Sequence, residues 1–438
     1  IVANLSKFDV GQLIKNDQLS KISADIKIKG TSLDPEKANA VVSGKIHDAD
    51  FNSYVYKDIN LNGSIDKGKF DIDLLSNDPN AVVNLKATGL YTSDNLAVAL
   101  KGRIEKVNLK ELKFSESTMS FAGDVDADFT NLDLDELNGQ LFLENFAISD
   151  GTEIYPIQDL KLFAISENDT NILQLNSQIL DLQLIGNYKL TQISESLLQT
   201  INSYYKFTES KDLNKIKLDS GQFFNLVGVV KNDDLIRKFV PDLTYFENIN
   251  LVGNYDADLR KITLNANVPL VEYGENKVEN VLINIENNEQ DLSVIANVGG
   301  FNTSSFALNE VNLGAKVADN QIDFDLSVLD FDRELQYYIG GLLDAQSEEK
   351  RLVLKPDGFK LNYEDWTVAP DNYLALATNG LYAHNVLLDH NGSQIFLDSE
   401  EDSGDSPLNV AIKDFQIETL TRIIQSDSLL ASGVINGT

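Results

Sequence analysis

Residues 22–28 read ISADIKI, an unbroken alternation of apolar and polar side chains. A period of two places every second side chain on the same face of an extended strand. The same pattern returns along the chain, at 70–74, 96–100, 251–259, 262–268, 292–298 and 322–328. One face of each strand is then apolar and the other polar or charged, which is typical of an antiparallel sheet with one face in water.

Turn residues separate these runs roughly every ten residues, a spacing that indicates an all-β chain. The strongest turn signal is Asn391-Gly392, because a type I′ hairpin turn needs positive φ at both central residues. Weaker turn signals lie at 78–80, 93–95, 286–289 and 318–320. The sequence therefore predicts an elongated, repetitive antiparallel β-sheet.

Glycine recurs on the apolar side of the strands, in the local pattern apolar-x-Gly-x-apolar. Glycine lets a strand bend sharply. The bend also makes a concave apolar wall with room for a ligand, and the two interpretations are compatible. The glycines in this pattern are Gly44, Gly63, Gly102, Gly123, Gly139, Gly186, Gly228 and Gly253.

Short amphipathic helices are predicted at 191–205, 232–240 and 332–339, where apolar residues follow a helical period. We expect them to be plugs or lids on the sheet, with their apolar stripes in the core. They divide the chain into a β segment at 1–190, a helix-interrupted segment at 191–245, a β segment at 246–330 and a helix-plus-β segment at 331–438.

Composition excludes several classes of function. The 438 residues include 68 acidic and 36 basic side chains, and the net charge of -32 argues against nucleic acid as a partner. The absence of Cys excludes disulfide scaffolds and thiol catalysis. The one Met is Met119 and the chain opens with Ile1, so we expect a section of a longer chain whose membrane anchor lies outside this sequence.

The search for catalytic chemistry finds no site. His47, His384 and His390 have no nucleophile at a suggestive spacing. Residues 124–128 place carboxylates at every second position, but in a strand these lie nearly ~7 Å apart, so a solvated outer face is favoured over a metal site. The acidic run 398–405 is interpreted as a solvated loop. The sequence thus predicts a non-enzyme without cofactor or metal.

An apolar sheet face of this length needs a cover, because soluble proteins rarely expose large apolar patches. Either two such sheets face each other, or one sheet folds over lengthwise. We expect the second arrangement, a taco-like groove with an apolar interior, which suits an acyl chain at about 0.8 kcal/mol per buried methylene. The residues expected to line this groove are Ile22, Ile26, Ile28, Phe70, Ile72, Leu74, Leu96, Val98, Leu100, Phe121, Val125, Leu251, Tyr255, Leu264, Ile283, Val294, Phe324 and Leu326.

A strand-helix-strand unit is predicted at both ends of the chain, at 8–30 and 415–437, with a shared apolar-x-apolar-x-x-Leu start and Gly-Thr following an Ile. These units, together with residues 54–65 and 135–139, resemble the AsmA-like family, and within it the TamB branch. The resemblance spans essentially the whole chain through loose motifs.

The resemblance implies a taco-shaped periplasmic protein that bridges the inner and outer membranes of a Gram-negative bacterium. It further implies an inner-membrane anchor, phospholipids as cargo, and an Omp85-type barrel as a partner in outer-membrane protein assembly. It carries over no catalytic residue.

Two other classes of function stay open. A β-solenoid or sandwich-array adhesin or envelope scaffold would have a dry interior packed by large side chains and no groove. An envelope glycosidase with paired carboxylates has enough Asp and Glu, but a single Trp gives no sign of an aromatic sugar-binding cleft.

Overall fold

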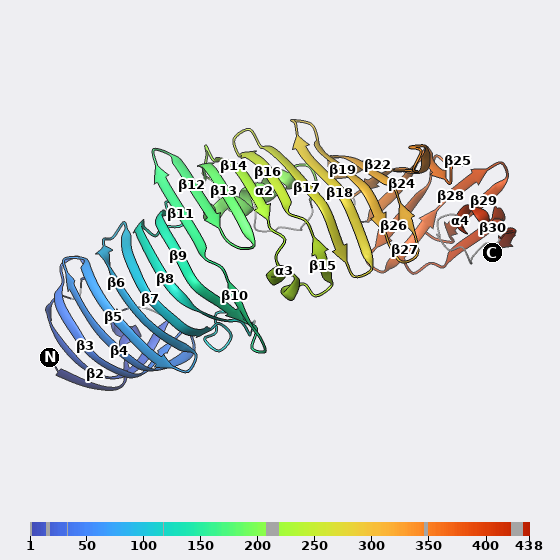
Figure 1. Cartoon of the computed structure of the whole chain (residues 1–438). Helices are drawn as coiled ribbons and strands as arrows, with labels where there is room; N and C mark the ends of the chain where they lie inside the picture. Colours follow the sequence, from blue (N-terminus) through green and yellow to red (C-terminus); the bar gives the residue numbers. More distant parts are fainter. Residues whose placement is uncertain are drawn as a thin grey trace. The chain divides into compact units, whose positions relative to one another are not determined.

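The computed structural model describes residues 2–14, 18–32, 34–116, 118–206, 219–345, 349–421 and 432–438. The fold is nearly all antiparallel β, with 67% strand and 6% helix, which confirms the all-β, antiparallel part of the predicted fold; the lengthwise groove stays a prediction. The chain divides into two compact units, residues 1–191 and 192–438. Figure 1 shows the succession of strands along the chain.

The first unit is one antiparallel sheet in which almost every strand pairs with the next one in sequence. The exception is β9, which pairs with both β10 and β11. Its elements are β1 (Val2–Asp9), α1 (Val10–Ile14), β2 (Leu19–Thr31), β3 (Asn39–Phe51), β4 (Tyr54–Asp66), β5 (Lys69–Asp78), β6 (Ala81–Tyr91), β7 (Leu96–Asn108), β8 (Ser120–Asn131), β9 (Asn138–Ser149), β10 (Ile154–Ile157), β11 (Leu160–Glu167), β12 (Thr170–Asn176) and β13 (Leu180–Asn187).

The second unit opens with helix and continues as a sheet in the order β14, β16, β17, β18, β19, β21, β22, β23, β24. Strands β15 and β20 attach to the ends of β17 and β19. The elements are η1 (Leu190–Gln192), α2 (Ile193–Asn202), β14 (Phe223–Val230), α3 (Asp234–Phe239), β15 (Leu243–Phe246), β16 (Ile249–Asp256), β17 (Lys261–Tyr273), β18 (Asn276–Asn287), β19 (Leu292–Asn302), β20 (Ala307–Leu308), β21 (Glu310–Ala318), β22 (Gln321–Leu329), β23 (Leu335–Asp344) and β24 (Lys350–Leu361).

Beyond β24 the second unit splits into two layers. The start of β24, at 350–352, pairs with β26, whereas its end, at 359–361, pairs with β25. Strand β26 leads only to β27, while β25 leads through β28 to the last strands. These elements are β25 (Glu364–Val368), β26 (Tyr373–Ala377), β27 (Gly380–His384), β28 (Val386–His390), β29 (Ser393–Ser399), β30 (Leu408–Gln416), α4 (Glu418–Thr421) and β31 (Val434–Gly437).

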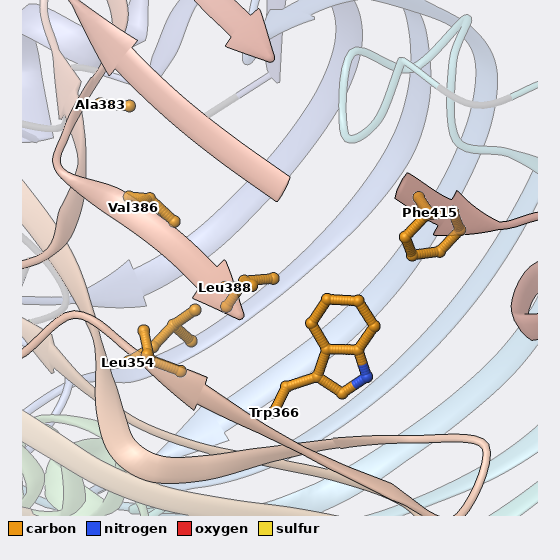
Figure 2. Close-up of a cluster of buried hydrophobic side chains, with 7 residues drawn as sticks. Leu354, Trp366, Ala383, Val386, Leu388 and Phe415 are labelled. Carbon is orange, nitrogen blue, oxygen red and sulfur yellow. The ribbon is translucent and has the colours of Figure 1, made fainter. Parts of the chain in front are cut away.

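A hydrophobic core lies where β24 splits. Figure 2 shows Trp366 and Phe415 facing each other from different strands, with ring centroids 5.8 Å apart. Trp366 keeps 3% of its surface exposed and Ala383 keeps 0%. The buried members of this terminal core are Leu354, Trp366, Val368, Ala383, Val386, Leu388 and Phe415.

The predicted turns are confirmed. Asn391 has φ 52° and Gly392 has φ 91°, and they join β28 to β29 with His390 opposite Ser393. The turn signal at 78–80 connects β5 to β6. Short-range chemistry therefore fixes where the strands reverse.

Two predicted helices are confirmed and one is wrong. Helix α2 lies within 191–205, and α3 begins after Asp233, whose carboxylate accepts a hydrogen bond from the N–H of Leu235 at 2.8 Å. The helix expected at 332–339 is instead strand β23. Its residues Tyr337 and Ile339 lie opposite Val328 and Leu326 of β22, and this pairing overrides the weak helical spacing before Gly340-Gly341.

The strand-helix-strand order is confirmed at both ends of the chain, but the pairing differs. Phe8 lies opposite Ile22, whereas Phe415 lies opposite Ile435. The 20-residue sequence correspondence therefore does not place equivalent residues in equivalent register. Residues 422–431 of the second unit's copy lie outside the described residues.

Candidate functional site

The candidate site in the first unit is the apolar face of its sheet. The antiparallel register places large apolar residues and glycines side by side from β2 to β13. One row across the strands is Ile28, Val42, Gly63, Ile72, Ala87, Leu100, Ala127, Leu141, Leu162, Leu175 and Leu182. The neighbouring row, up to β11, is Ile26, Gly44, Leu61, Leu74, Leu85, Gly102, Val125, Leu143 and Leu160.

Burial differs between the two faces of this sheet. The leucines of both rows are half-buried, while across the sheet the side chains of Asp71 and Lys86 are 51% and 57% exposed. On β8 the apolar face is more deeply buried, since Val125 and Phe129 each keep only 7% of their surfaces exposed. Burial of the apolar face thus varies along the unit.

The register brings all predicted first-unit lining residues to this face. Most are half-buried, Val125 is buried, and Ile28 and Leu96 are 37% and 38% exposed. The predicted residues here are Ile22, Ile26, Ile28, Phe70, Ile72, Leu74, Leu96, Val98, Leu100, Phe121 and Val125, with Gly44, Gly63, Gly102, Gly123, Gly139 and Gly186 among them. Their role in binding stays a prediction.

The second unit has an apolar face of the same construction. One row is Leu226, Gly253, Leu264, Ile285, Val294, Ala315, Phe324, Gly341 and Leu354. The next row is Gly228, Leu251, Ala266, Ile283, Ala296, Leu313, Leu326, Ile339 and Phe359. These rows contain the predicted Leu251, Leu264, Ile283, Val294, Phe324, Leu326, Gly228 and Gly253, and Tyr255 lies one step along the same face. Both rows end at β24, beside the terminal core.

Glycine is required at some positions of this face and not at others. At Gly139, φ is +150° and a Cβ would lie 2.2 Å from the carbonyl oxygen of Asp128 on β8. At Gly63, a Cβ would meet no atom closer than 3.4 Å. The shared sequence pattern therefore includes both close backbone approaches and positions that would accept a methyl group.

Helix α2 covers one edge of the second unit's apolar face, through contacts that the sequence pattern did not reveal. The hydroxyl of Tyr255 lies 2.7 Å from Ser196 Oγ and 2.9 Å from Thr200 Oγ1, and it donates to the carbonyl oxygen of Ser196 at 2.8 Å. All three side chains are buried. The predicted apolar stripe is less buried here, since Leu198 is 39% exposed.

The two tyrosines that follow α2 are more deeply buried than its apolar stripe. Tyr204 and Tyr205 keep 8% and 5% of their surfaces and pack with Leu292 and Val317 of the same apolar face. The Tyr204 hydroxyl donates to the carbonyl oxygen of Asn288 at 2.6 Å. A periodic reading of 191–205 finds these tyrosines but gives no sign of what they contact.

The opposite face of the first unit carries paired charges. Lys101 lies 2.7 Å from Asp126, and Arg103 lies 2.8 Å from Asp124. Hydrogen bonds from Asn145 and Arg103 lower the pKa of Asp124. These groups line a shallow hollow of about 470 Å³. Asp124 and Asp126 in this hollow are paired with cations of the same sheet, in keeping with the interpretation of 124–128 as a solvated face.

The histidines lie in local hydrogen bonds and ring contacts. His47 Nε2 lies 2.8 Å from Asp25, His390 Nδ1 lies 2.7 Å from the carbonyl oxygen of Asp365, and the His384 ring stacks on Tyr373. Across the described ranges, no group of three or more His, Asp or Glu side chains is placed to hold a metal ion. Within the same ranges, none of the helices has both the length and the apolar character that crossing a bilayer requires.

Comparison with known proteins gives no relative: no family model, no curated protein and no solved structure matches this chain.

Proposed function

We propose that this chain is a non-enzymatic lipid conduit that holds acyl chains on the apolar faces of its two units. The observation that carries the proposal is the unbroken cross-strand register of apolar residues, from β2 to β13 in one unit and from β14 to β24 in the other. The half-buried leucines on these faces still have apolar surface to give to a ligand.

The physical basis is burial of methylene groups. Each methylene moved from water to an apolar surface contributes about 0.8 kcal/mol. Successive strands lie ~4.8 Å apart and present chemically similar side chains, so an acyl chain meets a series of nearly equivalent positions with no deep trap. In this proposal the glycine positions bend the strands into a lengthwise groove around the lipid.

The resemblance to the AsmA-like family sets the wider proposal. The cargo is then phospholipid, the location is the periplasm between inner and outer membranes, and the neighbours are an inner-membrane anchor and an Omp85-type barrel. The paired charges on the opposite face of the first unit, such as Lys101 with Asp126, support an orientation with that face in water.

The test compares two adjacent residues of β22. Leu326 lies on the apolar face and Ser327 on the other face, opposite Asn312 and Tyr338. We expect native mass spectrometry of the purified chain to detect bound phospholipid, Leu326→Asp to reduce it at least about tenfold, and Ser327→Asp to leave it unchanged, with similar circular dichroism for all three. Wild-type protein free of lipid, or full lipid loading of Leu326→Asp, would contradict the proposal.

A second candidate function is favoured by the terminal core. Trp366 and Phe415 pack in a buried apolar core among strands that pair in two separate directions, as a sandwich scaffold would have. We therefore limit the proposed lipid path in the second unit to β14–β24 and assign β25–β31 a packing role.

A further inference from the structure

Helix α2 lies on the edge row of the second unit's apolar face, which contains Tyr255, Ile262, Leu292, Val317 and Ile322. The contacts that attach α2 to the sheet differ in kind from those of the residues that follow it. The helix side chains with least exposure are Ser196 and Thr200, at 2% and 3%, and both contact the hydroxyl of Tyr255.

The segment 204–206 is fixed by both apolar and polar contacts. Beside the packing of Tyr204 and Tyr205, the N–H of Asn320 donates to the carbonyl oxygen of Tyr204 at 2.8 Å. The N–H of Lys206 donates to the side chain of Asn320 at 3.0 Å. The segment is thus attached to the turn between β21 and β22 as well as to the turn after β18.

The two attachments have unequal strength. Hydroxyl hydrogen bonds exchange easily for hydrogen bonds to water, so they contribute little net free energy compared with two buried tyrosine rings. A helix of 10 residues is also shorter than the ~12–15 residues that an isolated helix needs to persist in water. The N-terminal end of α2 is fixed as well, since the side chain of Gln192 accepts hydrogen bonds from the Gln222 amide at 2.8 Å and from the N–H of Asp219 at 3.1 Å. Opening is therefore favoured within α2, between Gln192 and the Tyr204–Tyr205 segment.

We propose that α2 is a cover hinged at both of its ends, at Gln192 and at the Tyr204–Tyr205 segment, which opens away from Tyr255 and controls entry of an acyl chain at the Phe224–Tyr255 edge of this face. This inference rests on the proposed lipid function and adds its regulation. An incoming acyl chain replaces the helix over the rings of Phe224 and Tyr255, whose centroids lie 5.4 Å apart.

Hydrogen exchange tests the hinge without any lipid. Tyr255→Phe removes the hydroxyl that Ser196 and Thr200 contact, and the double change Ser196→Ala with Thr200→Ala removes the other side. We expect the amides of α2 to exchange about tenfold faster in both variants, while those of β18 and β19 stay unchanged. Alanine favours helix, so faster exchange in the double variant reports lost docking and not a weaker helix.

The matched control is Tyr273→Phe, since Tyr273 is 48% exposed in the same unit and lies away from α2 at the other end of β17. It should leave α2 exchange at the wild-type rate. Unchanged α2 exchange in Tyr255→Phe would overturn the hinge, and so would equal acceleration throughout β18 and β19, because that pattern indicates global unfolding.

Uptake of parinaric acid, a fluorescent fatty acid, tests the control of entry. We expect Tyr255→Phe to speed the initial uptake several-fold, and Tyr273→Phe to match wild type. Equal rates for wild type and Tyr255→Phe would overturn the control of entry. No uptake by wild type would refute the proposed lipid function and, with it, the control of entry, while the exchange experiment would still decide the hinge.

Discussion

Replacing Gly139 with alanine tests whether close approach of the backbones of β8 and β9 requires glycine on the apolar face. Gly139 lies on β9 between Phe129 of β8 and Ala164 of β11. A Cβ at this position would lie 2.2 Å from the carbonyl oxygen of Asp128, 2.5 Å from Phe129 Cα and 2.7 Å from Phe129 Cδ1. Two of these atoms are backbone, so a rotamer change of Phe129 cannot relieve the clash.

The magnitude follows from two costs. The backbone at φ +150° is open to glycine and strained for alanine, which costs about 1–3 kcal/mol. Moving β8 and β9 apart by the ~1 Å needed to reach van der Waals contact is overpacking, which costs a further 1–3 kcal/mol or so. Because relief of one cost partly relieves the other, we expect the free energy of unfolding of the first unit to fall by about 2–4 kcal/mol.

The assay is urea unfolding followed by circular dichroism, with the fluorescence of Trp366, the one Trp of the chain, as a reference from the second unit. Gly139→Ala should lower the urea midpoint of the first unit and leave the Trp366 midpoint unchanged. The control is Gly63→Ala, which shares the sequence pattern but has space for a methyl group, and we expect a change within about 0.5 kcal/mol or a slight gain. Equal effects of the two substitutions would refute the argument.

Two further predictions concern single groups. The pKa of Asp150 lies far below its ordinary value, because its carboxylate accepts hydrogen bonds from the N–H of Glu153, from the hydroxyl and N–H of Thr152 and from Tyr155. The order that these bonds give to the turn should be present above about pH 4 and be lost as the pH falls toward the folded-state pKa. An NMR titration of the carboxyl carbon with a midpoint near 3.9 would contradict this. The fluorescence of Trp366 should be unaffected by brominated phospholipids bound to the chain, since bromine quenches only on close approach and the ring is 3% exposed, and strong quenching would instead extend the lipid path into the terminal core.

Alternation and turn chemistry carried most of the fold prediction. Both are local properties: a period of two fixes which side chains share a face, and Asn391-Gly392 fixes a reversal wherever it occurs. Every predicted lining residue therefore fell on the apolar face of its unit, although nothing in the sequence pattern said which strands would pair. The antiparallel neighbour-to-neighbour order supplied that pairing almost everywhere.

The errors come from contacts between distant residues. The spacing of Leu335, Tyr338 and Ile339 fits a helix, but Phe324 and Leu326 on the preceding strand offer a ladder in which the same stretch buries its alternate residues. The docking of α2 through Ser196 and Thr200 was equally hidden, because hydroxyl residues on a helix carry no periodic apolar signal. The terminal core forms because the two ends of β24 pair with different strands, and no residue pattern within β24 indicates this.

The degree of burial differs between parts of the two apolar faces. Where this chain covers an apolar face with its own residues, burial is nearly complete. Leu292 and Val317, which pack with Tyr204 and Tyr205, keep 6% and 4% of their surfaces exposed. No buried member of the terminal core keeps more than 9% of its surface exposed. The leucines in the rows of the first unit, from Leu61 on β4 to Leu182 on β13, stay half-buried, whereas Val125 and Ala127 in the same rows are buried. The chain builds tight covers elsewhere but leaves these leucines partly accessible, and exposed apolar surface costs solubility unless something occupies it. In the function that we propose, an acyl chain is this occupant, because it is apolar and chemically repetitive along its length, as the rows are.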